Sequence, residues 1–212
     1  MVSDIVFFNS SNEANMRLIA NMAKSLGYGS LIILIEDSDK NNKKTNTTSI
    51  EFKETQGIIC IPVKILSSQT FLKKKWSEPI AVQSSEQDRA VIERGPSVMW
   101  GFELGQRKDF THQRGSGLNH ILCEIAHQKN VAILFSLKDI FTAKNQGVML
   151  GRVSQNIRLC QKFSVPMIIG SGASSPYEMR SPRDIQALFC ELGMKPEIAK
   201  KAMDANEFVR KT

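Results

Sequence analysis

One stretch of the chain, residues 167–193, encodes a strand, a loop and a capped helix without interruption. The apolar run Met167–Ile169 stops at the small residues 170–176, which predicts a strand that ends in a loop. Ser181 is placed to cap the next helix, with Pro182 in its first turn and Gly193 at its left-handed end. One face of this helix carries a recurrent apolar stripe: Ile185, Leu188, Phe189 and Leu192. A helix with such a stripe must pack on a sheet, so the stretch is a βα unit.

The same alternation of strand and helix extends over the rest of the chain. Strands are expected at seven places: 4–8, 31–35, 57–66, 80–83, 98–102, 131–135 and 167–169. Strands that alternate with helices predict a parallel sheet, and 212 residues suit one domain of barrel size. We therefore predict a single α/β domain over 1–212, a TIM-barrel-like parallel barrel with seven strands in place of the usual eight.

One segment does not fit the alternation, the polar stretch at 37–49. It consists almost entirely of Asp, Lys, Asn, Ser and Thr, where a barrel would place a helix. This composition predicts an exposed, flexible loop. Its lysines could contact a nucleic acid or simply remain in water.

Composition narrows the classes of partner. The chain has 28 Lys and Arg against 21 Asp and Glu, a formal net charge of +7 that favours a polyanionic partner without identifying it. Its four cysteines are far apart and form no CxxC pair, which indicates reduced thiols. No apolar run approaches the ~20 residues of a membrane span, and residues 1–8 lack the long hydrophobic region expected of a signal peptide. We expect a cytoplasmic protein with no membrane contact.

Two places combine basic residues with features that suit phosphate or nucleic acid. Arg180 and Arg183 flank the helix cap after the loop at 170–176, where guanidinium groups and free backbone N–H groups could face an anion. Both could equally be solvated arginines at a helix start. The run 71–76 places three lysines between Phe71 and Trp76, which suits nucleic acid or a solvated basic turn anchored by its aromatic residues.

A third basic segment begins at Glu103 and ends in the glycine-containing turn at 115–117, just before a helix. Such a turn can bind phosphate through its amides, although its spacing fits neither the GxGxxG fingerprint nor a P-loop. In the next helix we expect a buried stripe of Leu118, Ile121, Leu122 and Ile125. The opposite face then carries His120, Cys123, Glu124 and His127. Zinc usually needs four ligands from more than one element, so we expect no metal there and interpret His120 as an exposed residue able to meet a phosphate or a base.

The helix after the sixth strand follows the same logic. Its expected buried residues are Leu150, Val153, Ile157 and Cys160. Arg152, Arg158 and Lys162 are then expected on its exposed side.

Three segments together, GSGLNHILCEIAHQKNVAILFSL, IRLCQKFSVPMIIGSGAS and YEMRSPRDIQALFCELGM, carry a family resemblance. The chain resembles ribonuclease P protein component 3, the archaeal and eukaryotic thirty-kilodalton subunit. The resemblance covers residues 95–211, with the RSPRD motif, the SGAS loop and the LGM turn in the same order and spacing. The first ninety residues agree only in the order of strands and helices, and the polar segment at 37–49 replaces much of the second helix.

The resemblance implies a barrel related to phosphoesterases of the polymerase and histidinol phosphatase type. It also implies a protein cofactor of ribonuclease P, in which the RNA subunit removes the 5′ leader from precursor tRNA. Implied partners are ribonuclease P RNA, ribonuclease P protein component 2, the other protein subunits, and precursor tRNA as substrate. No catalytic residue and no bound cofactor is implied for the chain itself, whereas Mg²⁺ is expected in the ribonucleoprotein.

The family also implies RNA-contacting positions. By motif they fall on Arg89, Arg114, His120, Lys129, Lys162, Arg180 and Lys200. We add Arg183 because of its place beside the helix cap.

Two other functions remain open at this point. A metal-dependent phosphoesterase on the same barrel would need several His and carboxylate ligands at the carboxyl ends of strands. The first strand, DIVFFNS, has no His-x-His pair, and none of the three histidines lies at an expected strand end. A basic interaction protein without an RNA partner is equally compatible with the charge alone.

Overall fold

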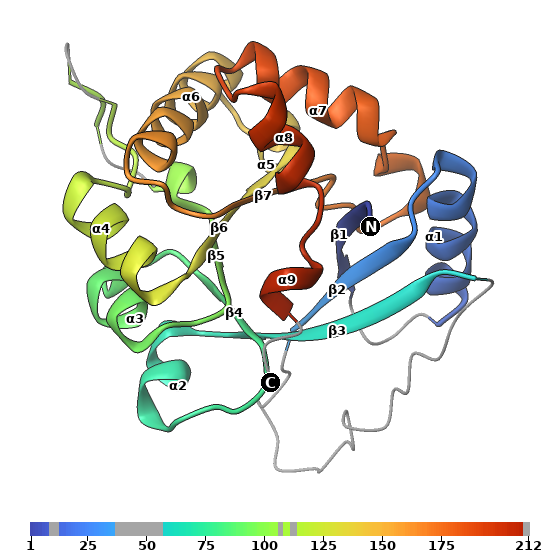
Figure 1. The fold of residues 1–212 in the computed structure, drawn as a ribbon, viewed down its shortest axis with the longest axis horizontal. Coiled ribbons are helices and arrows are strands. Elements are labelled where there is room, and N and C mark those ends of the chain that lie inside the picture. The colour runs from blue at the N-terminus through green and yellow to red at the C-terminus, as the bar shows by residue number, and fades with distance from the viewer. Residues whose placement is uncertain (9–12, 37–56, 106–107, 111–113, 210–212) are drawn as a thin grey trace.

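The computed structural model describes residues 1–8, 13–36, 57–105, 108–110 and 114–209, and its framework is a parallel sheet (Figure 1). The strands are β1 (Ser3–Phe8), β2 (Ser30–Glu36), β3 (Ile59–Leu66), β4 (Ile80–Gln83), β5 (Val98–Trp100), β6 (Ala132–Ser136) and β7 (Met167–Gly170). Each strand pairs in parallel with the next one along the chain. The predicted seven-stranded barrel is confirmed, with strand ends shifted by up to two residues. The predicted loop at 37–49 lies outside the described residues.

Helices lie around the outside of the sheet, except for α9, which lies over one end of the barrel (Figure 1). They are α1 (Glu13–Leu26), α2 (Ser68–Lys73), α3 (Asp88–Arg94), α4 (His120–Lys129), α5 (Leu137–Thr142), α6 (Gln146–Lys162), α7 (Pro182–Glu191), α8 (Pro196–Ala202) and α9 (Asn206–Val209), with short 3₁₀ turns η2 (Phe102–Leu104) and η3 (Pro176–Glu178). None of the described helices is both long and apolar enough to span a membrane.

The barrel closes through a seam between β1 and the segment after β7. The Gly172 N–H donates to the Ile5 carbonyl and the Phe7 N–H donates to the Ala173 carbonyl, each at 2.9 Å. The buried Asp4 carboxylate accepts from the Ser171 N–H at 2.7 Å and from the Ser171 hydroxyl at 2.6 Å. Burial raises the pKa of Asp4 to about 6, although the bonds from Ser171 favour the charged form.

The other end of the barrel is covered by the segment that leads into α9, which crosses the centre of the view in Figure 1. The Asn206 amide donates to the hydroxyls of Ser3 and Ser30, at 3.1 and 3.2 Å, where β1 and β2 begin. Ala205 is fully buried with the residues of the barrel interior. The C-terminal segment therefore covers the amino ends of the strands.

The strands are apolar on both faces because each face is buried. Alternate residues point into the barrel: Ile5, Ile32, Leu34, Val63, Ala81, Val98, Trp100, Ala132, Leu134 and Ile168. The intervening residues, such as Leu31 and Ile33 of β2, pack against the helices instead. Burial on both faces explains why the strands appear in the sequence as continuous apolar runs.

The βα unit at 167–193 forms as predicted. The Ser181 hydroxyl accepts from the Asp184 N–H at 3.3 Å, Pro182 begins α7, and Gly193 adopts φ +100°. Ile185 and Phe189 are fully buried, whereas Leu188 is half-buried. The apolar stripe therefore packs on the sheet mainly through two of its four residues.

The buried face predicted for the helix after residue 117 is confirmed at Leu118 and Leu122 and wrong at two other positions. Ile121 is 44% exposed, and Cys123, expected on the opposite face, is fully buried. The reason is the helix start: α4 begins at His120 because the Asn119 side chain caps it by accepting from the Leu122 N–H at 3.0 Å. From that start the inward face is Leu122, Cys123 and Ala126, while Leu118 is buried in the preceding loop.

The pattern of Ser85 with Asp88 three residues later predicts a helix capped by Ser85, and the pair Gly95-Pro96 predicts its end. The helix α3 begins only at Asp88. Ser85 still contributes, because its hydroxyl accepts from the Gln87 N–H at 3.2 Å and its own N–H donates to the Asp88 carboxylate at 2.7 Å. The predicted end is confirmed, since Gly95 has φ +76°.

The packing of α7 generates a stability prediction. Replacing Phe189 by alanine should lower the free energy of unfolding by about 3 to 5 kcal/mol, because a fully buried ring leaves a cavity beside Phe135. Urea denaturation measures the change. The control Leu188→Ala should cost clearly less, since that side chain is only half-buried. Equal losses for the two variants would contradict this packing.

Candidate nucleic-acid interface

A hollow of about 600 Å³ lies at the carboxyl ends of the strands, where TIM-barrel enzymes place their active sites. It is lined by Phe7, Phe8, Asn15, Leu34, Glu36, Ile65, Gln83, Trp100, Lys138, Asp139 and Ser174. The rings of Phe7 and Trp100 lie 5.8 Å apart between centroids. The lining thus mixes apolar and aromatic side chains with polar ones, and Glu36 and Asp139 are its carboxylates.

These residues do not fit a catalytic metal centre. Among the described residues, no group of three or more His, Cys, Asp and Glu side chains could hold a metal ion. A cation already occupies the rim, because the Lys138 ammonium donates to the Ser174 hydroxyl and lies 3.6 Å from the Glu178 carboxylate. Burial raises the pKa of Asp139 to about 6, although Lys138 opposes the shift. The described residues of the hollow therefore do not supply the donor set of a metal-dependent phosphoesterase.

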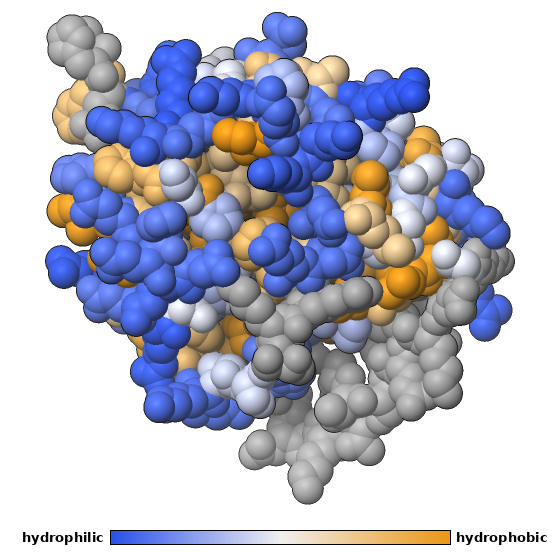
Figure 2. Space-filling model, viewed as in Figure 1, coloured by the Kyte–Doolittle hydropathy of each residue, from blue (hydrophilic) through white to orange (hydrophobic). Residues whose placement is uncertain are grey.

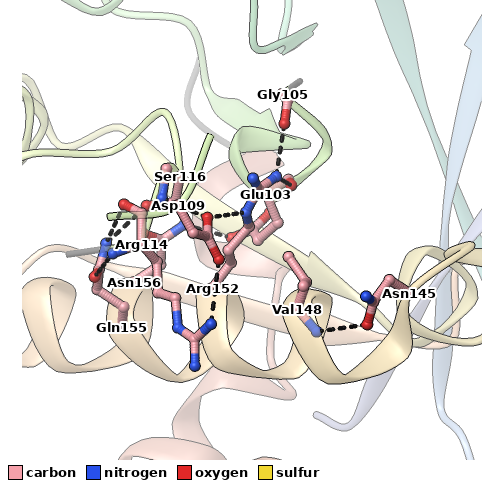
Figure 3. A network of polar contacts seen from close by, with 11 residues as sticks. Glu103, Gly105, Asp109, Arg114, Ser116, Asn145, Val148, Arg152, Gln155 and Asn156 are labelled. Atoms are coloured by element: carbon pink, nitrogen blue, oxygen red, sulfur yellow. Dashed lines mark hydrogen bonds and ion pairs between the residues drawn. The ribbon is translucent and has the colours of Figure 1, made fainter. Parts of the chain in front are cut away.

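Beside this hollow, a polar network fixes the segment between β5 and α4 to helix α6 (Figure 3). Arg152 is central to it and was expected on the exposed side of the helix, which is wrong: the residue is buried. Its Nε donates to Asp109 at 3.0 Å, and its Nη1 donates to the carbonyls of Glu103 and Gly105 at 2.9 and 2.6 Å. A charged residue is buried here because it replaces the hydration of its guanidinium with these acceptors.

Glu103 is the acidic member buried in the same network. The Asn156 amide donates to its Oε1 at 2.7 Å, and the Ser116 hydroxyl donates to Asn156 Oδ1 at 2.7 Å. Burial raises the pKa of Glu103 to about 7, while Asn156 and Arg152 favour the charged form. The hydrogen bonds that link Glu103, Asn156 and Ser116 thus connect η2, α6 and the turn before α4.

Arg114 is the predicted RNA-contacting residue that this network positions. Its N–H donates to Gln155 Oε1 at 2.8 Å and its carbonyl accepts from Gln155 Nε2 at 3.2 Å, so the backbone is held at both groups. Its side chain is exposed and its Nη1 donates to Asp109 at 3.2 Å. A Cβ on Gly151 would lie 3.0 Å from the Arg114 guanidinium carbon, so the absence of a side chain on α6 makes room for it.

Arg180 and Arg183 lie at the start of α7, near the same carboxyl end of the barrel. The Arg180 Nη1 donates to the carbonyls of Tyr177 and Met179, at 2.9 and 2.7 Å, and its own carbonyl accepts from the Tyr28 hydroxyl at 2.7 Å. Both arginine side chains are exposed. Arg180 is therefore held by its own loop as well as open to solvent.

The structure does not bring all the predicted residues together. In a parallel barrel, a helix begins at the carboxyl end of the strands and ends at the amino end. Arg89, Arg114, His120, Arg180 and Arg183 accordingly lie near helix starts, and Lys129, Lys162 and Lys200 lie in last helical turns. All eight are exposed, and Arg89 forms an ion pair with Glu93 at 2.9 Å. They form two groups at opposite ends of the barrel.

The lysine-rich run at 71–76 lines a groove of about 470 Å³ between α2 and α3. Lys74, Lys75 and Arg94 contribute charge to it, and Lys74 Nζ lies 3.9 Å from the Trp76 ring centroid. The Trp76 Nε1 donates to the Phe71 carbonyl at 3.3 Å. The structure confirms a turn anchored by aromatic residues with exposed lysines, whereas binding of nucleic acid by this run stays a prediction.

Hydrophilic residues cover most of the face shown in Figure 2, with smaller apolar areas between them. This face carries α8 and α9 at the amino end of the barrel, in the same orientation as Figure 1. The positions Arg107 and His112, noted in the basic segment of the sequence, lie outside the described residues.

Comparisons with known proteins place the chain among related sequences. Residues 108–210 match the model of the family described as RNase P subunit p30. Ribonuclease P protein component 3 of Methanosarcina mazei is 29% identical over 201 residues, which cover 91% of this chain and 80% of that protein. The protein of the same name from Methanococcoides burtonii is 35% identical over 92 residues, which cover 42% of this chain but only 38% of the relative's length.

Two solved structures share the fold. One chain in a cryo-EM structure of archaeal ribonuclease P with mature tRNA superposes with a TM-score of 0.73 at 20% identity, over 97% of this chain and 89% of that one. Histidinol phosphate phosphatase from Lactococcus lactis, crystallised with zinc, L-histidinol and phosphate, gives a TM-score of 0.56 at 10% identity, over 92% and 94% of the two chains. At these identities the likeness concerns the fold.

The buried Glu103 generates a prediction about pH. An acid whose pKa is raised in the folded state holds its proton there longer than in the unfolded chain, so stability should fall as pH rises from about 4.5 to about 7. Glu103→Gln should remove on the order of 3 kcal/mol of this pH dependence, because an amide does not titrate. The variant should still fold, since the glutamine oxygen can accept from Asn156 as the carboxylate does. Urea denaturation of both proteins between pH 4.5 and 8 measures it.

The difference between the two proteins is the informative quantity, because Asp4 and Asp139 also have raised pKa values and add to the same trend. Parallel stability curves for wild type and Glu103→Gln would contradict the buried, protonated state of Glu103.

Proposed function

Because residues 108–210 match the model of the family described as RNase P subunit p30, we propose that the chain is a protein subunit of ribonuclease P. In this role it supports the RNA subunit in removing the 5′ leader from precursor tRNA. The family match carries the proposal, since the matched segment contains both Arg114 with Gln155, which holds its backbone, and the loop that holds Arg180. The likeness to a chain of an archaeal ribonuclease P supports the same fold for this role.

The RNA contacts proposed for this chain are electrostatic. Eight exposed residues supply them: Arg89, Arg114, His120, Lys129, Lys162, Arg180, Arg183 and Lys200. Phosphate contacts of this kind give affinity without reading sequence, which suits a protein that stabilises a folded RNA. Because the residues lie at two ends of the barrel, we propose that RNA contacts more than one face of the protein.

The chemistry of cleavage is assigned to the RNA. We propose that the isolated chain binds no metal cofactor and does not hydrolyse phosphodiesters, and that Mg²⁺ acts in the RNA site of the ribonucleoprotein. The hollow at the carboxyl ends of the strands supports this division, because Lys138 occupies its rim and its lining supplies two carboxylates. The proposed partners are ribonuclease P RNA, protein component 2, the other protein subunits and precursor tRNA, in the cytoplasm.

The rival function is a metal-dependent phosphoesterase on the same barrel. Its support is the fold shared with histidinol phosphate phosphatase. The donor groups that such chemistry requires are not gathered among the described residues, so the subunit role is the better supported of the two. Metal-dependent hydrolysis by the purified chain, abolished by substituting its own residues, would reverse this preference.

Electrostatic binding predicts a steep dependence on salt. If at least four of the cations contact phosphate, the logarithm of the association constant should fall against the logarithm of salt concentration with a slope steeper than about −3. Filter binding of the protein and component 2 to ribonuclease P RNA, between low and physiological salt, measures the slope. A flat response would count against the RNA role.

A matched pair of arginines tests the site more locally. Arg114→Ala should weaken RNA binding about tenfold by removing charge-assisted hydrogen bonds, yet leave the free energy of unfolding within about 1 kcal/mol, because Gln155 still holds its backbone. Arg158→Ala removes the same charge from an exposed position of α6 outside the proposed set and should bind within about twofold of wild type. Equal RNA affinities for the two variants would contradict the role of Arg114.

A further inference from the structure

A second, smaller hollow of about 340 Å³ lies between α5 and η3, beside the loop that holds Arg180. It is lined by Lys138, Phe141, Thr142, Ser171, Tyr177, Glu178 and Arg180. Among these residues, only Arg180 is a predicted RNA contact. The hollow places aromatic and polar side chains beside its guanidinium.

Two of the lining residues are aromatic and expose their rings to an unusual degree. Tyr177 is 86% exposed and Phe141 is 56% exposed. Among the described residues, the Tyr177 hydroxyl has no hydrogen-bond partner, so neither packing nor a polar contact explains the ring's position. Two exposed rings that line one hollow provide flat apolar surfaces suited to a planar ligand.

The loop that carries Tyr177 is held rigidly. The Ser174 N–H donates to the Glu178 carboxylate at 2.7 Å, and the Met179 N–H donates to the Pro176 carbonyl at 3.3 Å. At its far end the Arg180 carbonyl accepts from the Tyr28 hydroxyl. Because the backbone on both sides of Tyr177 is fixed, binding a ligand there orders little additional chain.

The charge at the edge of the hollow indicates what the ligand carries. Arg180 uses Nη1 for two loop carbonyls, and its Nε and Nη2 have no partner within the described part of the chain. The Glu178 carboxylate is engaged by the Ser174 N–H and by Lys138. Besides the Tyr177 hydroxyl, the Arg180 guanidinium therefore supplies free donors at the hollow, and a guanidinium favours a phosphate oxygen.

We infer that this hollow binds one unpaired nucleotide of an RNA, with its base against Tyr177 and Phe141 and its phosphate at Arg180. The inference rests on the proposed RNA role and adds a chemical class to it, namely single-stranded RNA in place of a duplex backbone. Base stacking is tolerant of sequence because every base has a π-face. An apolar side chain of a protein partner would pack on the two rings but leave the donors of Arg180 unused.

The test uses the full chain and two probes, a ten-nucleotide oligouridylate and a ten-base-pair RNA duplex. Tyr177→Ala should weaken binding of the oligouridylate about tenfold, since one stacked base is lost, while Tyr177→Phe should keep wild-type affinity. Phe141→Ala should show a smaller loss in the same direction. Binding of the duplex should be unchanged in all three variants.

Phe110→Ala is the matched control, because Phe110 is 73% exposed and lies outside the hollow. It should bind both probes as wild type does. Thermal unfolding should be unchanged for Tyr177→Ala, since the ring is almost fully exposed.

Three outcomes would overturn the inference: failure of the wild-type chain to bind oligouridylate, equal affinities for Tyr177→Ala and wild type, or an equal loss in Phe110→Ala. If Tyr177→Ala keeps oligouridylate affinity but impairs precursor tRNA cleavage in the reconstituted complex, the hollow docks a protein and the inference is wrong. The proposed function fails separately, namely if the wild-type chain does not support cleavage by ribonuclease P RNA at all.

Discussion

The barrel depends on one buried carboxylate at the place where a regular strand pair is missing. Seven strands in order leave β1 and β7 to meet at the seam, where the residues after β7 complete the pairing with β1. Asp4 accepts from both the backbone and the hydroxyl of Ser171 and so satisfies groups that a longer ladder would otherwise satisfy. The same contact sets the path of the chain from Gly172 to the start of α7. The placement of Arg180 at the barrel mouth is thus a consequence of how the barrel closes.

Much of this architecture can be predicted from the sequence because its determinants are local. The strand at 167–170, the Ser181 cap and the left-handed Gly193 are each specified by residues within one or two turns of the chain. The buried position of Arg152 could not be predicted in the same way. Its partners Asp109 and Glu103 lie 43 and 49 residues away, and a lone arginine in a helix normally indicates an exposed face. Part of the predicted face of α4 is wrong because the Asn119 cap starts the helix at His120, which leaves Leu118 in the preceding loop and turns Cys123 inward.

The candidate site divides along the same line. The residue types were identified from motifs, and Arg114 and Arg180 each lie in a segment fixed by hydrogen bonds. Their distribution over two ends of the barrel follows from the direction of each helix, which no motif records. The sequence does not indicate a binding role for Tyr177, although it belongs to the same motif as Arg180, because an aromatic residue near an apolar strand is usually part of a core. Only its exposure shows that it is available to a ligand.

Gly151 leaves space on the surface of helix α6 for a side chain from another segment. Glycine within a helix costs about 1 kcal/mol relative to alanine, and here the space it leaves receives the guanidinium of Arg114 from a separate segment. A single methyl group at this position would displace that guanidinium by steric contact while the net charge of the protein stayed the same. Arg114 therefore supplies the charge, whereas Gly151 determines where that charge lies. A substitution at either position can change one of these properties without the other.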